Sequence, residues 1–513
     1  MLTAAASEVE LKLRVPPDAY AQLLRHPVLR DDREPDIHRL YAIYFDTPQQ
    51  DLWRAGLALR VRRDGASWTQ TLKGGGSADA GLHTRIEIES PIARPLPDLA
   101  LLPEGPWVDK AAAIVAGRAL RRVFATQFAR TTRLLRRAPD ALIEASLDRG
   151  VIRTSGASES FCELELELKA GSPGALYDLA LELFASVPVA VDNESKAERG
   201  YALHNGIDGQ PKKASTVALA PGMTVEDALE AVVRTVLSHV QANGAGLLRH
   251  SDPEYVHQLR VALRRLRSAF SVFRPVVDGA TAERIVPQIR GLARVLGAAR
   301  DWDVFIENAC AQALAAFPDH AGVQAYAREF RRRQKLARRK AQRAIGSPRY
   351  QRLLLELGAW LHARRWRECA YPDAPAILER PVTTYAADVL EARYTRMRKR
   401  GRRIEEHSPE ELHALRIAAK KLRYAAHFFA RLYDEERVQA LLARLARLQD
   451  ALGALNDAAT VQALVDGASP DGAPRDIAEA HGILVAWSRG QTTLLRREAE
   501  RAWRALRRCP AFW

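Results

Sequence analysis

The chain has few cysteines, and they are widely separated. Its four cysteines are spread over 513 residues without a Cys-x-x-Cys pair. This spacing argues against a disulfide scaffold and against a zinc site built on cysteine. No stretch approaches about 20 uninterrupted apolar residues, so no membrane span is expected. The N-terminus lacks a basic region and soon reaches acidic residues, so we expect no signal peptide and predict a cytoplasmic protein.

Positive charge is concentrated in the second part of the chain. Residues 1–205 hold 26 Lys and Arg against 28 Asp and Glu, whereas the remainder holds 51 against 34. The net charge of +15 therefore arises after residue 205, which favours an anionic partner for that part. An Arg-rich but merely solvated surface is the alternative explanation of the charge alone.

The hydrophobic periodicity divides the chain in the same place. From residue 8 to about 200, charged and apolar residues alternate, as in 8–13 and 163–169, which is typical of half-buried antiparallel strands. Residues 206–221 are rich in Gly, Pro and Lys and predict a linker. From about 222 onward the period is near 3.6, which predicts helices.

A basic helical segment occurs twice, at a constant offset of 156 residues. The two cationic sets are His257, Arg260, Arg264 and Arg267, then His413, Arg416, Lys420 and Arg423. Leu-Gly pairs at 296–297 and 452–453, followed by Arg300-Asp301 and Asn456-Asp457, keep the same offset. Within each set the positions lie at i, i+3, i+7 and i+10, hence on one face of a helix. A duplicated unit with matched cationic faces indicates a long, regularly charged polyanion as ligand.

Charged residues on the predicted strands segregate by sign. Glutamates stand at positions 8, 10, 163, 165 and 167, whereas Arg60, Arg62 and Lys73 are basic. A sheet with a charged outer face is the alternative. If the strands close into a barrel with these side chains inside, the cations would bind phosphate oxygens. The glutamates would then hold a hard divalent cation, Mg²⁺ or Mn²⁺ rather than Zn²⁺.

An ordered set of motifs over roughly residues 5–205 resembles the CYTH family, the triphosphate tunnel metalloenzymes. The set comprises ExExK at 8–12, YFDT at 44–47, Arg-x-Arg at 60–62, Lys73, Arg85-Ile86-Glu87, Arg130, Asp148, the acidic strand at 163–167, and Ser195-Lys196-Ala197 with Arg199. The first motif alone is weak, whereas the ordered set is specific.

This resemblance implies an eight-stranded antiparallel tunnel that binds triphosphate compounds with Mg²⁺ or Mn²⁺. The matching metal ligands are Glu8, Glu10, Glu163 and Glu165, with Asp148 and Glu167 as additions. The matching phosphate-binding cations are Lys12, Arg60, Arg62, Lys73, Arg85, Arg130 and Lys196. The expected catalytic residues are Glu10, Lys12 and Glu165. For Glu87 and Glu89 the alternative is that they balance neighbouring cations inside the tunnel.

The helical half resembles the CHAD domain, which is associated with polyphosphate binding. The resemblance rests on the two cationic segments and the two Leu-Gly blocks, and implies that the eight His, Arg and Lys residues named above contact phosphate. Arg265 lies off that face. The predicted fold is therefore α+β: an N-terminal eight-stranded antiparallel β-tunnel at 1–205, a linker, and an all-α domain at 222–508. That domain would consist of two duplicated helical bundles, at about 222–370 and 380–508.

The leading hypothesis is metal-dependent hydrolysis of inorganic triphosphate in the tunnel, with polyphosphate bound by the helical half. One competitor is an adenylyl cyclase-type reaction on ATP in the same tunnel, and another is a non-enzymatic polyphosphate receptor. Nucleic-acid binding follows from charge alone and is not favoured, because no zinc-finger or RRM motif supports it. The sequence leaves open the preferred chain length, the choice of metal, the role of the helical domain in delivering substrate, and the oligomeric state.

Overall fold

The chain folds into two compact units. A computed structural model describes residues 6–30, 34–137, 140–206, 209–277, 279–369, 371–466, 475–490 and 492–513. The first unit runs to Gln210 and also takes in Ser347–Arg365, and the second contains Pro211–Gly346 and Trp366–Trp513. Helix α11 (Pro348–His362) therefore belongs to the first unit, although the sequence on either side of it belongs to the second. None of the described helices is both long and apolar enough to cross a membrane.

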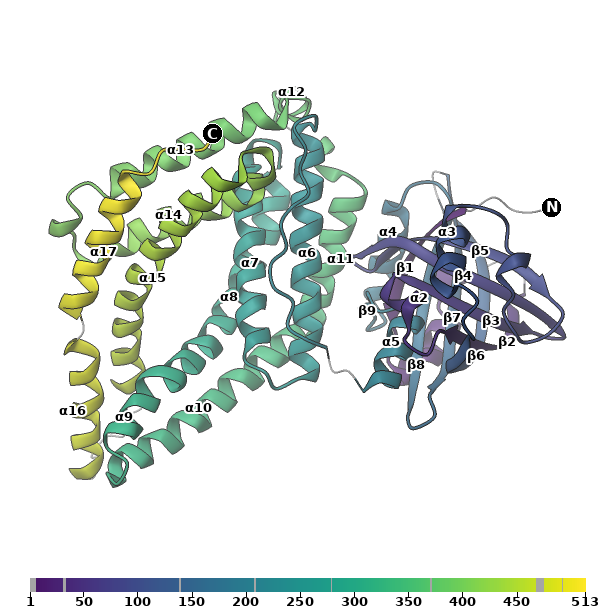
Figure 1. Ribbon diagram of the computed structural model, residues 1–513, viewed down its shortest axis with the longest axis horizontal. Helices are drawn as coiled ribbons and strands as arrows, with labels where there is room; N and C mark the ends of the chain where they lie inside the picture. The colour runs from purple at the N-terminus through teal and green to yellow at the C-terminus, as the bar shows by residue number, and fades with distance from the viewer. Residues whose placement is uncertain are drawn as a thin grey trace. The chain divides into compact units, whose positions relative to one another are not determined.

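Eight antiparallel strands of the first unit form a closed barrel, as predicted (Figure 1). The strands are β1 (Ala6–Arg14), β2 (Asp36–Asp46), β3 (Leu57–Asp64), β4 (Ser67–Asp79), β5 (Leu82–Ile92), β6 (Arg121–Arg137), β7 (Ala141–Arg153) and β8 (Ser158–Ala170). They are hydrogen-bonded in the order β5-β4-β3-β2-β6-β7-β8-β1, and a further β5–β1 pairing closes the ring. The short strand β9 (Ala190–Val191) adds to β1.

The strand register places the charged residues on one face. Residues directly opposite each other in a sheet point to the same side. Lys12 lies opposite Glu165, Glu8 opposite Arg85, and Lys73 opposite Glu87. On neighbouring strands Asp148 lies between Arg130 and Glu163. The alternation read from the sequence thus becomes a charged inner face of the barrel.

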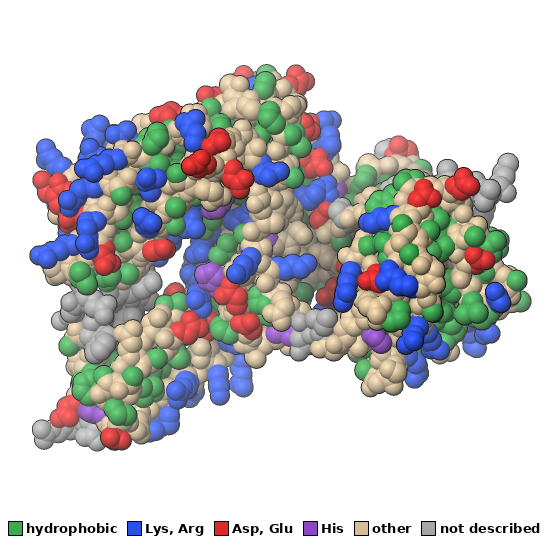
Figure 2. Space-filling view, viewed as in Figure 1, with side chains coloured by type: hydrophobic (Ala, Val, Ile, Leu, Met, Phe, Trp, Pro, Cys, Tyr) green, Lys and Arg blue, Asp and Glu red, His purple; other side chains and the backbone are tan. Residues whose placement is uncertain are grey.

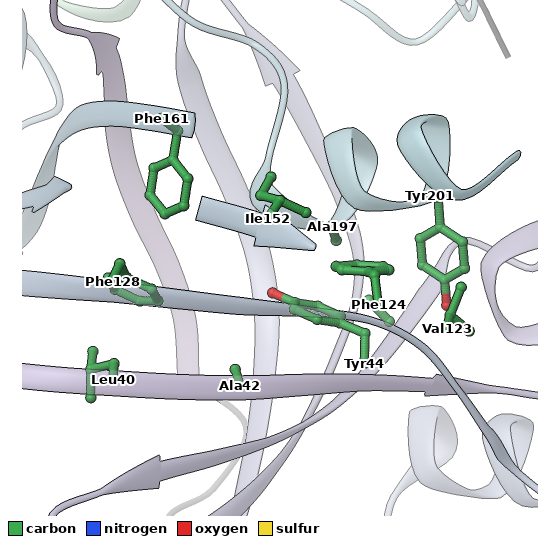
Figure 3. Close-up of a cluster of buried hydrophobic side chains, with 11 residues drawn as sticks. Leu40, Ala42, Tyr44, Val123, Phe124, Phe128, Ile152, Phe161, Ala197 and Tyr201 are labelled. Carbon is green, nitrogen blue, oxygen red and sulfur yellow. The ribbon is translucent and has the colours of Figure 1, made fainter. Parts of the chain in front are cut away.

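The inner face also carries an apolar cluster, which lies against helix α5 (Lys196–Asn205) (Figure 3). Tyr44 of β2 and Phe124 of β6 stack with ring centroids 4.3 Å apart, and Tyr201 of α5 meets Phe124 edge-on at 5.3 Å. A Cβ at Gly200 would lie 2.1 Å from the Phe124 ring, so only glycine lets α5 approach this closely. The cluster fixes α5, whose first residue is Lys196.

The outer face of the barrel is covered by helices. Leu59, Val61 and Leu72 alternate with the inward cations and pack with Val108 and Ala111. The last two residues lie on α3 (Pro106–Val115). The other helices of this unit are α1 (Tyr20–Leu24), α2 (Asp51–Arg54), α4 (Gly174–Phe184) and α11. Burial of apolar side chains at about 25 cal/mol per Å² stabilises this layer and holds the barrel wall in place.

The second unit is helical, as predicted. Its helices are α6 (Val225–Arg249), α7 (Glu254–Val272), α8 (Gly279–Phe305), α9 (Ala311–Ala316), α10 (Ala321–Ile345), α12 (Ala374–Leu378), α13 (Val382–Arg400), α14 (Pro409–Phe429), α15 (Glu435–Asp466), α16 (Arg475–Gly490) and α17 (Thr492–Arg507). The segment before α6 has no regular structure, but Val217 and Leu219 are buried.

The helices of this unit repeat in the register seen in the sequence. The first residues of α7 and α14 are 155 positions apart, and their last residues are 157 apart. The first residues of α8 and α15 are 156 positions apart. The pair α7 and α8 packs together as α14 and α15 do, and α7 packs against α14. A capping box of Ser408 and Glu411 begins α14. The side chains of Asn456 and Asp457 lie outside the described residues.

Candidate functional site

Three carboxylates converge inside the barrel. Oxygens of Asp148, Glu163 and Glu165 lie within 4.8 Å of one another, and all three residues are buried. Asp148 comes from β7 and the two glutamates from alternate positions of β8, so the strand period aims both at the same point. Three carboxylates are the hard oxygen ligands that Mg²⁺ and Mn²⁺ prefer. The donor set therefore fits the metal predicted from the sequence.

Lys196 already places a positive charge among these carboxylates. Its ammonium donates to Asp148 at 2.7 Å, to Glu165 at 3.0 Å and also to Glu163. The same nitrogen lies over the Phe128 ring, 5.0 Å from its centroid. Burial alone would lower the pKa of Lys196, but the surrounding carboxylates raise it above its ordinary value. The structure thus places Lys196 at the acidic cluster.

Arg130 and Lys12 complete the surroundings of the cluster. The Arg130 guanidinium donates twice to Asp148, at 2.8 and 2.7 Å, and also contacts Glu165. Lys12 is bonded to Glu165 and lies 3.1 Å from Glu10. Burial would raise the pKa of Glu165, but these cations hold it well below its ordinary value. Burial raises the pKa of Glu163, so the two glutamates of one strand differ in proton affinity.

A second group of paired charges surrounds Glu87. Its carboxylate accepts from Arg60 at 2.9 Å and lies 2.8 Å from Lys73. Lys73 also donates to Glu8 at 3.1 Å. Burial raises the pKa of Glu8 to about 7. The structure therefore places Glu8 with Lys73 and Glu87, and not in the cluster of three carboxylates.

The remaining predicted tunnel residues lie around these two groups. Arg62 approaches Glu89 at 3.6 Å, and Arg85 donates to Glu198 at 3.2 Å. Glu167 lies opposite Glu10 but is only half-buried, and it contacts Lys169 at 2.6 Å. Each tunnel cation predicted to bind phosphate thus has a carboxylate partner. A triphosphate would have to exchange with these internal partners.

Several supporting residues were not singled out from the sequence. Asp192 binds Arg14 and Arg199, and Glu198 forms a capping box with Ser195 at the start of α5. The Ser-x-x-Glu spacing was a usable signal for this cap.

Asp46 of the YFDT motif also has a supporting role. Its carboxylate accepts from the backbone of Leu52 and Trp53 and from the Tyr201 hydroxyl. The aspartate therefore ties α2 and α5 to β2.

The repeated cations of the helical unit lie close to one another. Figure 2 shows Lys, Arg and His side chains around a hollow over α7, α8, α14 and α15. Burial lowers the pKa of Arg260, and its neighbours Arg264, Arg300 and Arg416 lower it further. A Cβ at Gly297 would lie 2.9 Å from the Arg260 guanidinium. The Arg260 guanidinium therefore lies directly over Gly297 of the first Leu-Gly block.

The other members of the two cationic sets lie along the same helices. Burial lowers the pKa of His257, and the nearby Arg300 lowers it further. His413 is exposed, and Arg423 donates to Gln449 at 3.2 Å. Arg265, which lies off the stripe, is buried and donates to the Ser215 carbonyl at 2.9 Å.

A cavity of about 660 Å³ lies between α7, α8 and α14. Three of the predicted polyphosphate ligands line it, Arg264, Arg267 and Lys420. Three further cations outside the two predicted sets also line it, together with one acid: Arg274, Arg290, Lys421 and Glu283. The positions 156 residues after Arg274 and Arg290 are alanines, Ala430 and Ala446. The charge of Arg274 and Arg290 is therefore particular to the first repeat, whereas Lys421 is the second-repeat counterpart of Arg265.

Comparisons with known proteins agree with the division of the chain into a barrel part and a helical part. The CYTH domain model matches residues 6–201 and the CHAD domain model matches residues 231–466. An inorganic triphosphatase of Haemophilus influenzae is 30% identical over 197 residues, which are 38% of this chain and 54% of that protein. An uncharacterized protein of Mycobacterium tuberculosis is 27% identical over 429 residues, 78% of this chain and 77% of that protein. The crystal structure of the CHAD domain from the plant Ricinus communis is 29% identical, with a TM-score of 0.51, covering 60% of this chain and all of that one.

Proposed function

Because residues 6–201 are a CYTH domain and residues 231–466 are a CHAD domain, we propose that this protein hydrolyses inorganic triphosphate in its tunnel with Mg²⁺ or Mn²⁺. The observation that carries the proposal is the buried cluster of Asp148, Glu163 and Glu165 inside a ring of Lys and Arg. The similarity to an inorganic triphosphatase over the same domain supports the choice of substrate. The cytoplasmic location stays a prediction.

The protein's own residues would act mainly by binding and positioning. Arg60, Arg62 and Lys73 would exchange their glutamate partners for phosphate oxygens, which they bind more favourably because phosphate carries more charge. Glu10 and Glu165 would orient the attacking water, and Lys12 would hydrogen-bond the transferred group. A bound Mg²⁺ or Mn²⁺ would neutralise phosphate oxygens and lower the pKa of a coordinated water.

The charge pairing explains why a metal and a triphosphate should bind together. Each cation that turns to the phosphate chain leaves a partly buried carboxylate without its partner, which is unfavourable in the barrel interior. A divalent cation restores that balance. The arrangement therefore favours an enzyme that needs both ligands over a receptor that binds phosphate alone.

The test is a phosphate-release screen of the purified protein. We expect phosphate release from triphosphate with Mg²⁺ or Mn²⁺. Pyrophosphate, long polyphosphate and ATP should release phosphate much more slowly, and EDTA should abolish release from triphosphate. Formation of cyclic AMP and pyrophosphate from ATP would instead support the cyclase alternative. Binding of triphosphate in EDTA, with no turnover under any condition, would contradict hydrolysis and favour a receptor.

We also propose that the helical unit binds polyphosphate along its repeated cationic helices. The cavity between α7, α8 and α14 carries six Lys or Arg side chains against Glu283, and its volume suits several phosphate groups. The eight His, Arg and Lys residues of the two sets are the proposed polyphosphate contacts, and three of them line this cavity.

The double variant Arg264→Glu with Lys420→Glu is expected to weaken long-polyphosphate binding at least about tenfold, since a charged hydrogen bond contributes about 1.5–3 kcal/mol. Triphosphate turnover should be unchanged, because both residues lie in the second unit. Arg332→Glu is the matched control, since Arg332 is exposed on α10 and pairs with Glu329. Equal affinity of the double variant and the control, measured by calorimetry at fixed salt, would contradict the proposal.

A further inference from the structure

Helix α11 is built into the tunnel unit although the chain on both sides of it belongs to the helical unit. It packs against α4 (Figure 1). The rings of His362 and Tyr177 stack with centroids 5.4 Å apart and an interplanar angle of 7°. A Cβ at Gly358 would lie 2.2 Å from the Tyr177 ring, so the helix backbone rests directly on that ring. Such a close, buried fit makes α11 a part of the first unit and not a connector.

The same helix holds the tight turn between β4 and β5. His362 lies 2.8 Å from the carboxylate of Asp79, the last residue of β4, and both side chains are buried. Tyr177 donates its hydroxyl proton to the carbonyl of Ala80 at 3.0 Å. Ala80 itself adopts a positive φ of 52°, which is unfavourable for a residue with a side chain. The turn is therefore kept in a strained conformation by groups on α4 and α11.

The other side of the turn meets the strand that carries the ExExK motif. The backbone N–H of Lys12 donates to the Gly81 carbonyl at 2.9 Å. A Cβ at Gly81 would lie 2.6 Å from Val191 and 3.0 Å from Leu11, so the turn packs closely against β9 and β1. The contacts from His362 through Asp79 and Gly81 to Lys12 are continuous and buried.

We propose that α11 positions Lys12 for the reaction, with His362 as the positioning residue that acts through the turn. This inference rests on the proposed triphosphatase function, because Lys12 contacts both Glu10 and Glu165 at the expected reaction site. A displacement of about 1 Å in such a group can cost up to about 100-fold in rate. The chain enters α11 from the helical unit and returns to it, so the helical half of the sequence supplies part of the tunnel's catalytic support.

The test compares two substitutions of His362 in the full chain. His362→Phe keeps a ring to stack on Tyr177 but loses the contact with Asp79, whereas His362→Gln keeps a nitrogen donor within reach of Asp79. We expect His362→Phe to lower kcat about tenfold with KM unchanged, and His362→Gln to restore most of it. Amide hydrogen exchange of the peptide containing Lys12 should be faster in His362→Phe than in the unsubstituted protein, and should not be faster in His362→Gln. Arg365→Ala is the control, because it removes an exposed ion pair with Asp178 of α4.

Hydrogen exchange separates this inference from the proposed function. If the unsubstituted protein turns over triphosphate and His362→Phe matches it in kcat and in exchange at Lys12, the inference is wrong and the function stands. If the unsubstituted protein has no turnover, the proposed function fails and exchange at Lys12 alone decides whether α11 holds β1. Should His362→Phe fold poorly by thermal unfolding, Asp79→Asn makes the same comparison without changing α11.

Discussion

Glu165→Gln is expected to reduce kcat for triphosphate by about 10²–10³-fold, the usual cost of removing one preorganised charged or polar group from an active site. The substitution preserves shape but removes a charge that is shared by Lys12, Arg130 and Lys196. Those cations would then compete for the two carboxylates that remain in the cluster. Raising the concentration of Mg²⁺ or Mn²⁺ should recover little of the loss, because the missing carboxylate also orients the water.

Two comparison variants make this result specific. Glu144→Gln changes a partly exposed carboxylate on the neighbouring strand β7, 3.6 Å from Lys169, and should leave kcat within about twofold, because such a loose pair contributes little. Arg60→Ala should mainly raise KM, since Arg60 is expected to bind the phosphate chain and not the water. Steady-state kinetics with saturating metal measures all three. Full activity in Glu165→Gln would refute the assignment of the cluster.

Lys196→Met is expected to lower the free energy of unfolding of the metal-free protein by about 3–5 kcal/mol, the cost of breaking a buried ion pair from one side. The ammonium of Lys196 donates to all three carboxylates of the cluster. Without it, Asp148, Glu163 and Glu165 repel one another at close range in a buried site. Thermal and urea unfolding in EDTA would measure the loss.

Added metal should then stabilise the variant more than the unsubstituted protein. A divalent cation can replace the missing ammonium, and a ligand that binds only the folded state raises its stability. Lys169→Met is the control, because Lys169 is partly exposed and its pair with Glu167 should contribute only about 0–1 kcal/mol. If Mg²⁺ and Mn²⁺ shift the Tm of Lys196→Met no more than that of the control, the cluster is not a metal site.

The strand alternation predicted antiparallel strands and the 156-residue offset predicted the repeated helices, whereas the closed barrel was expected from the family resemblance. Both are local patterns: side-chain direction in a strand has a period of two, and a helical face has a period near 3.6, whatever the partner is. The family resemblance added the order of motifs, from which the number of strands and the inward direction of Lys12, Arg60 and Glu165 were expected.

The tertiary structure decided which of these residues meet. Glu8 and Glu165 have similar sequence surroundings, yet Glu8 lies with Lys73 and Glu87 while Glu165 joins Asp148 and Glu163. That difference arises from the register between strands distant in sequence, which local alternation does not specify. Helix α11 likewise shows ordinary helical periodicity. Its buried contacts with Tyr177 and Asp79 make it part of the tunnel unit, because packing depends on the shapes of both surfaces.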